Sequence, residues 1–225
     1  MAFVRKNQAD LSAQEWQALI AAIGALHGIG PSPRYREFVD VHVQAMSPPG
    51  MAWSVHSMPG MVGTKFLAWH RRFLAHLDGA LRHVDASVTL PYWDWIADPA
   101  PPAAISRPAL LRSWSVTRRW NAGWLPTAAD VNAVIARSDF ASFQRVLEQV
   151  HNNVHLAVGG TMGGALSPAD PLFFLHHANV DRLWAQWQRR HPRAKPGNVA
   201  DALPPLFGVK VSEVLSTAKL GYHCG

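Results

Sequence analysis

Histidine is the residue type in this chain whose spacing most strongly predicts chemistry. Six of the twelve histidines can be grouped into two sets of three. The members are, in order, His42, His56 and His70, and then His151, His155 and His177. Neutral imidazole binds copper, zinc, iron and nickel, so the ligand type alone does not choose the metal. Bundles that hold two iron or manganese ions project Glu and Glu-x-x-His inward, and these segments offer no such pattern. Two sets of histidine alone therefore predict a pair of copper ions.

Hydrophobic periodicity predicts the helices that position these histidines. The expected helices run from a Ser12–Glu15 capping box to Gly28, from Ser32-Pro33 to Ser47, and over about 63–84, 139–158 and 171–190. His42 and His70 lie on the apolar stripes of the second and third helices, and His177 on that of the fifth. His151 and His155 are four residues apart and therefore project from one helix face. Burying imidazole is costly unless its nitrogens find partners, and a metal ion supplies one.

The remaining segments predict loops around this helical core. The stretch 97–126 is rich in proline and aromatic residues and predicts a long irregular connection between two helical halves. After 192 we expect a tail of loop with a short element at 209–216. With 225 residues, 48% of them hydrophobic, the chain can build a sizeable core. We expect a single domain over 1–225, mainly α, with a four-helix bundle that holds a binuclear copper centre and long irregular loops.

Charge, hydropathy and cysteine content narrow the class of protein. The net charge is +6, but the basic residues are scattered, with short pairs such as Arg71-Arg72, and this favours a solvated basic surface over nucleic-acid binding. No apolar run approaches the roughly 20 residues that span a membrane. The first residues lack the apolar core of a secretory signal peptide, so we expect a protein that is cytoplasmic or exported with a partner. The single cysteine, Cys224, excludes an internal disulfide framework.

Four histidine-bearing segments carry a family resemblance. They are YREFVDVH at 35–42, FLAWHRRFLAHLD at 66–78, HNNVHLAVGGTM at 151–162 and DPLFFLHHANVDRLW at 170–184. Together they resemble the tyrosinase family of type 3 binuclear copper proteins, in particular the small bacterial tyrosinases and catechol oxidases. The resemblance implies that the first set of histidines binds one copper ion and the second set the other. In the last motif the family's ligand is the second histidine of the pair, which selects His177 over His176.

The chain departs from the family pattern at three places. The family places the second histidine of the first copper nine residues before the one that here is His70, but that position holds Met61. We therefore assign His56, fourteen residues before His70, through a longer loop. Asp78 stands where the family has Glu. Some relatives carry a cysteine linked to the second histidine, and we expect no such link because Cys224 is far along the chain.

The resemblance implies a copper oxidoreductase with dioxygen as its co-substrate. Such an enzyme hydroxylates monophenols, oxidises o-diphenols, or both, or oxidises o-aminophenols, to quinone-type products. Because a phenol has a pKa near 10, hydroxylation benefits from a local base. Glu148 and Asn152 lie on the helix face of His151 and resemble the Glu and Asn that hold a proton-accepting water in tyrosinases. They are the candidate catalytic residues.

Two other functions are compatible with the same histidines. A haemocyanin-like protein would bind dioxygen reversibly without turnover, and a zinc or nickel hydrolase would show no oxygen-dependent absorption. The short chain favours the enzyme, since oxygen carriers of this kind tend to have extra domains that cover the copper. As partners we expect a phenolic small molecule and, by resemblance to bacterial relatives, a small copper-delivery helper protein, but neither nucleic acid nor a membrane.

Several residues around the histidines also have an expected role. Asp78 and Asp181 are candidates to hydrogen-bond and so orient the imidazole rings, although Asp181 could pair with Arg5 or Arg182 instead. Phe173 and Phe174 are expected to keep bulk water from the metal pair. His27 lies at a helix end, where a cation is favoured.

Overall fold

The computed structural model describes residues 2–28, 34–46, 55–57, 64–204 and 207–225. In these ranges the helices are α1 (Ala13–His27), α2 (Arg34–Ala45), α3 (Phe66–Val84), α4 (Pro108–Ser113), α5 (Ala128–Ile135), α6 (Phe140–Val158) and α7 (Leu172–Arg190). Single 3-10 turns are η1 (Gln8–Asp10), η2 (Ala103–Ile105), η3 (Ala122–Trp124), η4 (Gly160–Gly163), η5 (Ser167–Ala169) and η6 (Val211–Val214). The strands are β1 (Phe3–Arg5) and β2 (Tyr222–Cys224). The predicted mainly α class is confirmed.

The long helices begin and end where local side-chain chemistry predicts. The Ser12 hydroxyl accepts from the Glu15 amide and the Glu15 carboxylate accepts from the Ser12 amide, which forms the expected capping box of α1. Asp139 caps α6 by accepting from the Ser142 amide at 2.9 Å. The predicted start of the second helix at Ser32-Pro33 lies outside the described residues.

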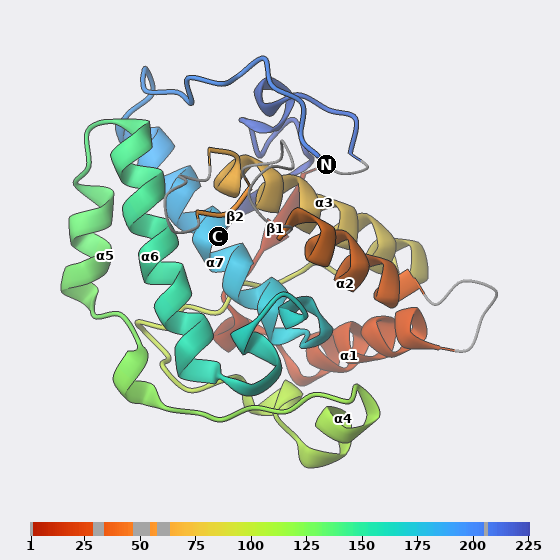
Figure 1. Cartoon of the computed structure of the whole chain (residues 1–225). Coiled ribbons are helices and arrows are strands. Elements are labelled where there is room, and N and C mark those ends of the chain that lie inside the picture. Colours follow the sequence, from red (N-terminus) through yellow and green to blue (C-terminus); the bar gives the residue numbers. More distant parts are fainter. Residues whose placement is uncertain (1, 29–33, 47–54, 58–63, 205–206) are drawn as a thin grey trace.

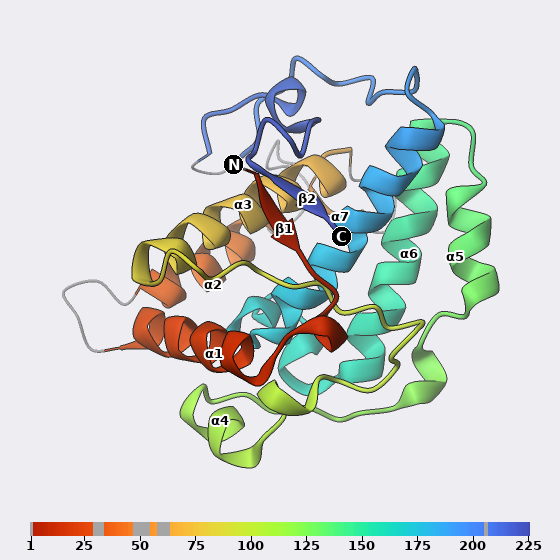
Figure 2. The same cartoon turned by 180° about the vertical axis from the view of Figure 1, so that it is seen from behind.

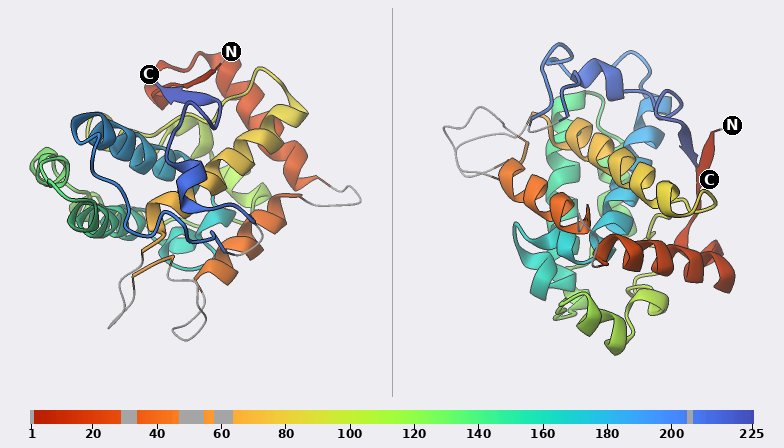
Figure 3. Two further views of the ribbon diagram at one scale, coloured as in Figure 1. Left: turned by 90° about the horizontal axis from the view of Figure 1, so that it is seen from above. Right: turned by 90° about the vertical axis from the view of Figure 1, so that its right-hand side faces the viewer.

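The bundle is built from α2, α3, α6 and α7. Figure 1 shows α7 in the middle of the molecule, with α6 on one side and α3 and α2 on the other. Helix α3 packs on α7 and on α1, and α1 also contacts α2, so these three N-terminal helices form one flank of the molecule (Figure 3, right). The core between the bundle helices contains the fully buried indoles of Trp69, Trp184 and Trp187. No helix within the described ranges is both long enough and apolar enough to cross a bilayer.

The connection between the two helical halves is more regular than expected. Residues 97–126 contain α4 and two 3-10 turns, and α5 follows directly. Pro108 begins α4, because its fixed φ and missing N–H suit the first turn of a helix. Helix α5, which was not expected, begins with a capping box of Thr127 and Asp130. The expected short element at 209–216 is η6.

The first and last described residues lie side by side and close over the bundle (Figure 2). Strand β1 pairs with β2 in parallel, with Phe3 opposite Tyr222 and Arg5 opposite Cys224. Behind the strands lies a buried set of polar side chains that we call the terminal ion cluster. Its members are Arg5, Arg71, Asp78, Asp181 and Tyr222.

The terminal ion cluster joins the strands to the helices α3 and α7. Arg5 Nη2 lies 2.5 Å from Asp78 Oδ2, and Arg5 Nη1 lies 3.0 Å from Asp181 Oδ2. Arg71 Nε lies 2.5 Å from the other Asp181 oxygen, and the Tyr222 hydroxyl also donates to Asp181. Two guanidinium groups thus face two carboxylates, which compensates the charges in a buried site.

Two expectations about these residues are wrong. Arg71 does not belong to a solvated basic surface, because its guanidinium pairs with Asp181 and stacks 3.6 Å from the centre of the Trp184 ring. Asp78 and Asp181 do not orient the histidine rings, since they accept hydrogen bonds from other members of the cluster and, at Asp78, from the Leu90 amide. Of the alternatives expected for Asp181, the pair with Arg5 is present.

Candidate metal centre

Three elements bring the first histidine set together. His42 comes from α2, His70 from α3, and His56 from the described segment 55–57 between them. One nitrogen of each ring lies within 4.8 Å of the others. His42 Nδ1 donates to the carbonyl of Ala165 at 2.8 Å, and His70 Nδ1 donates to that of Phe66 at 2.8 Å. The Nε2 atoms of all three rings are buried and have no partner among the described residues.

The second histidine set lies between α6 and α7. His151 Nε2 is 2.9 Å from His155 Nε2 and 3.0 Å from His177 Nε2. His155 Nδ1 donates to the carbonyl of Met162 at 2.7 Å. His151 Nδ1 has two oxygen acceptors, the Asn152 Oδ1 at 3.1 Å and a backbone carbonyl at 3.3 Å. The lone pairs of His151 and His155 therefore point at each other from their Nε2 atoms.

This arrangement fits metal ions better than it fits an empty core. A ring that donates its Nδ1 hydrogen to an oxygen presents a bare lone pair at Nε2, and this is how proteins orient a histidine ligand. Burial lowers the pKa of His42 and of His155 to about 4, so both rings are neutral at pH 7. Neutral, converging lone pairs without hydrogen-bond donors are a donor set that suits copper and the other metals that imidazole binds.

His176 also lies in the second cluster, where only its neighbour His177 was expected. The indole Nε1 of Trp95 donates to His176 Nδ1 at 3.1 Å. An indole N–H can only donate, so the hydrogen of the neutral His176 ring lies on Nε2 and neither nitrogen keeps a free lone pair. This tautomer favours His177 over His176 as the metal ligand.

The two candidate catalytic residues face different histidine sets. Glu148 is buried, and its carboxylate accepts from the Ser57 amide at 2.7 Å and from the Ser57 hydroxyl at 2.6 Å. One of its oxygens lies 3.7 Å from His56 Nδ1. Burial raises the pKa of Glu148, because the charged form loses hydration. Asn152 is exposed to solvent and contacts the ring of His151.

A cavity of about 240 Å³ connects both histidine sets to solvent. His42 and His56 line it from the first set, and His151 and His155 from the second. Leu156, half exposed, lies at its rim. Behind the cavity, Phe173 packs against rings of both sets, with its ring centre 4.1 Å from that of His177 and 5.0 Å from that of His42. The packing of Phe173 agrees with its expected role in keeping bulk water out.

The buried imidazoles predict that the metal-free protein loses stability in weak acid. The pKa of His42 and of His155 is about 4 when folded and 6.5 when exposed. Between these values the unfolded chain binds protons that the folded chain does not, so the free energy of unfolding falls as the pH falls. The expected loss is about 1.4 kcal/mol per pH unit for each ring. Urea unfolding of the metal-free protein at about pH 7, 6 and 5 measures it, and constant stability over this range would contradict the burial of neutral rings.

Comparisons with known proteins agree with this geometry. The family model described as the common central domain of tyrosinase matches residues 32–121 and 112–190. The chain is 36% identical to the tyrosinase of Streptomyces antibioticus over 84% of each chain. It is 26% identical to the grixazone synthase of Streptomyces griseus, over 85% of this chain and 86% of that one. A functional unit of octopus haemocyanin shares the fold, with a TM-score of 0.74 over 99% of this chain and 68% of that chain at 24% identity.

The copper pair of the family has a counterpart in the two histidine clusters. Each cluster brings at least three imidazoles within reach of one ion, and the similarity to tyrosinases extends over the segments that carry them. The carbonyl partners of the rings and the open cavity complete a site for metal and a small substrate. The chain therefore belongs to the tyrosinase family of type 3 copper oxidases, which act with dioxygen as co-substrate.

Proposed function

We propose that this protein hydroxylates monophenols and oxidises o-diphenols, with o-aminophenols as a further substrate class, to quinone-type products. His42, His56 and His70 hold one copper ion, and His151, His155 and His177 hold the other. The observation that carries the proposal is that the first set presents three Nε2 atoms without a partner in the described ranges and the second set three Nε2 atoms that converge, two of them within 3.0 Å of that of His151, and that both sets border one solvent-open cavity. When bound, the copper pair supplies the binding and activation of dioxygen.

The cavity fits a single aromatic ring. Its volume of about 240 Å³ lies below the range of roughly 300–1,000 Å³ that drug-sized ligands occupy. A phenol would enter past Leu156 and Asn152 at the rim, with its hydroxyl toward the histidines. Phe66 and Phe173 pack against the rings from within and exclude water from the inner side.

Glu148 is the group best placed to remove the phenolic proton. Its raised pKa makes the carboxylate a better base than an exposed one. It lies beside His56, on the face of α6 that also carries His151. In this proposal a water held between Glu148 and Asn152 takes the proton from the phenol, and Glu148 receives it.

Replacing Glu148 with Gln should separate the two reactions. We expect hydroxylation of a monophenol to slow by about a hundredfold, which is the lower end of what a general base contributes. Oxidation of a catechol should change less than about threefold, because a catechol already has a pKa closer to neutral and its oxidation adds no oxygen atom. Parallel assays of the copper-loaded variant and the parent protein on tyrosine and on a catechol provide the measurement.

Glu148 also accepts two hydrogen bonds from Ser57, so a control must separate the loss of the base from the loss of these bonds. Ser57→Ala removes the hydroxyl that donates to Glu148 but keeps the carboxylate and the Ser57 amide. It should change both activities alike, by about tenfold or less, because the base stays in place and only part of the roughly 1.5–3 kcal/mol that a hydrogen bond to a charged group contributes would reach the rate. Equal loss of both reactions in Glu148→Gln would mean that this residue only positions His56.

The same assay tests the oxygen-carrier alternative, which the fold of the haemocyanin unit allows. A carrier would bind dioxygen and produce no quinone colour from catechol. The open cavity and exposed Leu156 favour the enzyme, since a ring-sized substrate can reach the histidines. We also propose a small copper-delivery protein as partner, and a location that is cytoplasmic or, with that partner, exported.

A further inference from the structure

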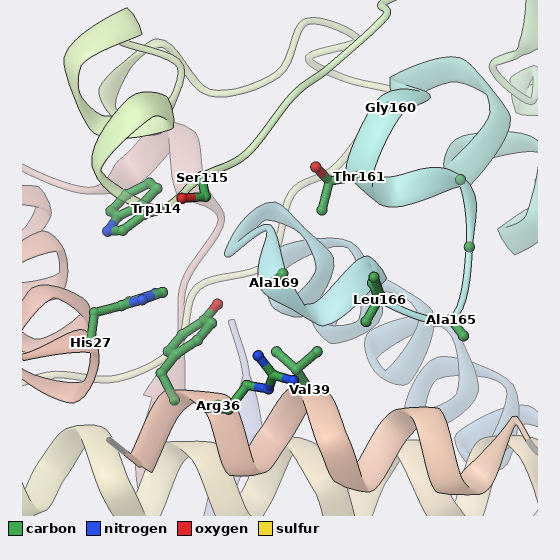
Figure 4. Close-up of a pocket in the computed structure, with 13 residues that line it drawn as sticks. His27, Arg36, Val39, Trp114, Ser115, Gly160, Thr161, Ala165, Leu166 and Ala169 are labelled. Atoms are coloured by element: carbon green, nitrogen blue, oxygen red, sulfur yellow. The ribbon is translucent and has the colours of Figure 1, made fainter. Parts of the chain in front are cut away.

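A second and larger cavity lies on the other side of the loop that borders the copper site. Its volume is about 720 Å³, within the range of small-molecule sites. His27 and Trp114 lie on one side and Ala165 and Leu166 on the opposite side, while Arg36 extends into it from α2 (Figure 4). Gly163 and Gly164 border both cavities, so one loop separates the two sites.

Hydrogen bonds within the chain hold the wall of this cavity in place. The wall therefore forms without a ligand. The Thr161 amide donates to the Thr117 carbonyl at 2.8 Å, and the Thr117 amide donates to the Thr161 hydroxyl at 2.9 Å. Gly160 allows this approach, since its φ is +56° and a Cβ would collide with the Thr117 carbonyl. Two nitrogens of Arg118 bind the two oxygens of buried Asp170, at 2.7 and 2.8 Å.

Aromatic rings form one side of the cavity. His27 stacks on Tyr35 with 3.8 Å between ring centres and an angle of 24°. Trp114 lies nearly parallel to His27, with 6.2 Å between centres. Burial lowers the pKa of His27, which disfavours the cation expected at this helix end. A planar aromatic ligand would find flat, apolar surface here.

Two polar atoms of these rings are buried without a partner among the described residues. They are the hydroxyl of Tyr35, a side chain only 2% exposed, and Nε2 of His27. A buried polar group without a hydrogen bond costs about 1–3 kcal/mol, and a ligand acceptor would remove that cost. The negative charge of Asp170 acts electrostatically on Tyr35, but this carboxylate is already paired with Arg118.

Arg36 adds a positive charge at the mouth. Its Nε lies 2.9 Å from Asp40 Oδ1, and its side chain is 72% exposed. Asp40 engages Nε, which leaves the two Nη atoms to reach a ligand. Because a guanidinium presents several N–H donors in one plane, it binds a carboxylate well.

We infer that this cavity binds an aromatic carboxylate, with the ring against His27, Trp114 and Leu166 and the carboxylate toward Arg36 and the Tyr35 hydroxyl. The site is separate from the copper cavity, and its occupation requires no turnover. The inference does not depend on the proposed oxidation of phenols.

Calorimetric titration of the copper-loaded protein with 2-naphthoate tests the inference. The neutral isostere 2-naphthylmethanol should bind at least about threefold more weakly, because it lacks the charge that Arg36 recognises. Arg36→Gln should weaken 2-naphthoate by about threefold to fivefold. Tyr35→Phe should weaken it by about threefold to tenfold through loss of one hydrogen bond. Arg145→Gln, an exposed arginine on α6 away from the cavity, is the matched control and should bind as the parent does.

One further variant, compared with Arg36→Gln, locates the ligand. Leu156 lines only the copper cavity, so Leu156→Ala should leave the affinity for 2-naphthoate unchanged. Hydrogen exchange should show protection in the segment around Thr161 and Leu166 when the ligand is bound. Thermal melting of each variant verifies that it is folded. Loss of affinity in Leu156→Ala but not in Arg36→Gln, equal binding of the neutral isostere, or no saturable binding would overturn the inference.

Discussion

Replacing His151 with Ala is expected to remove one of the two copper ions and to abolish oxidation of both phenols and catechols. His151 Nε2 lies within 3.0 Å of Nε2 of His155 and of His177, so it stands at the centre of the second cluster. Without it two nitrogens remain, which is one fewer than the three protein ligands that catalytic metal sites usually have. Copper analysis should give one ion per chain in place of two, and activity should fall by more than about a hundredfold, the upper cost of losing even an indirect ligand contact.

An exposed histidine provides the control for this experiment. His83 lies on α3, the same helix as His70, but is exposed and belongs to neither cluster. His83→Ala should therefore keep two copper ions and full activity. Retention of two copper ions by His151→Ala would contradict the assignment of the second cluster.

The second large effect is expected from the terminal ion cluster. Asp181→Ala removes the carboxylate that pairs with both Arg5 and Arg71, whose side chains are fully buried. Removing one partner of a buried ion pair leaves an uncompensated charge and costs about 3–5 kcal/mol of the free energy of unfolding. Chemical denaturation of the metal-free protein measures this difference without a contribution from copper binding.

A partly exposed ion pair gives the comparison. Asp94 pairs with Arg182 at 2.8 Å, and both side chains keep contact with water. Asp94→Asn removes the charge but keeps the oxygen that accepts from the Ile96 and Ala97 amides, and it should cost about 1 kcal/mol or less, since solvent screens such pairs. Equal effects of Asp94→Asn and Asp181→Ala would show that the cluster adds nothing beyond an ordinary surface contact.

The helices that carry most of the histidines were predictable because their signals lie in the local sequence pattern. A period of 3.6 residues places His70, His151 and His177 on inward faces, and the described α3, α6 and α7 have these residues buried. His56 lies in a segment without periodicity, and the family pattern places its ligand at Met61, so His56 was assigned through a longer loop. The structure places it beside His42 and His70, with ring centres at 5.5 and 4.9 Å.

Most features that depend on distant pairs were not predictable from the sequence, although the pair of Arg5 and Asp181 was among the alternatives. Arg71 pairs with a carboxylate 110 residues away, and no local pattern marks such a partner, so it was assigned to the surface. The carbonyls that orient His42 and His155 belong to Ala165 and Met162, whose backbone oxygens have no signature in the sequence. Helix α5 was missed for a different reason. Its capping box is a local signal, but the amphipathic segment that follows is too short to show a clear helical period.

The parallel pairing of β1 with β2 has a consequence for synthesis of the protein on the ribosome. Strand β1 is translated before all the described helices, yet its partner strand β2 is translated after them. Until then Arg5 lacks the Tyr222 ring on which its guanidinium stacks, and Asp181 lacks the hydroxyl of Tyr222. Contacts between such distant residues form late because loop closure must come first. The part of the terminal ion cluster that Tyr222 contributes is therefore completed only after β2 has been translated, whereas the pair of Arg71 and Asp181 can join α3 to α7 earlier.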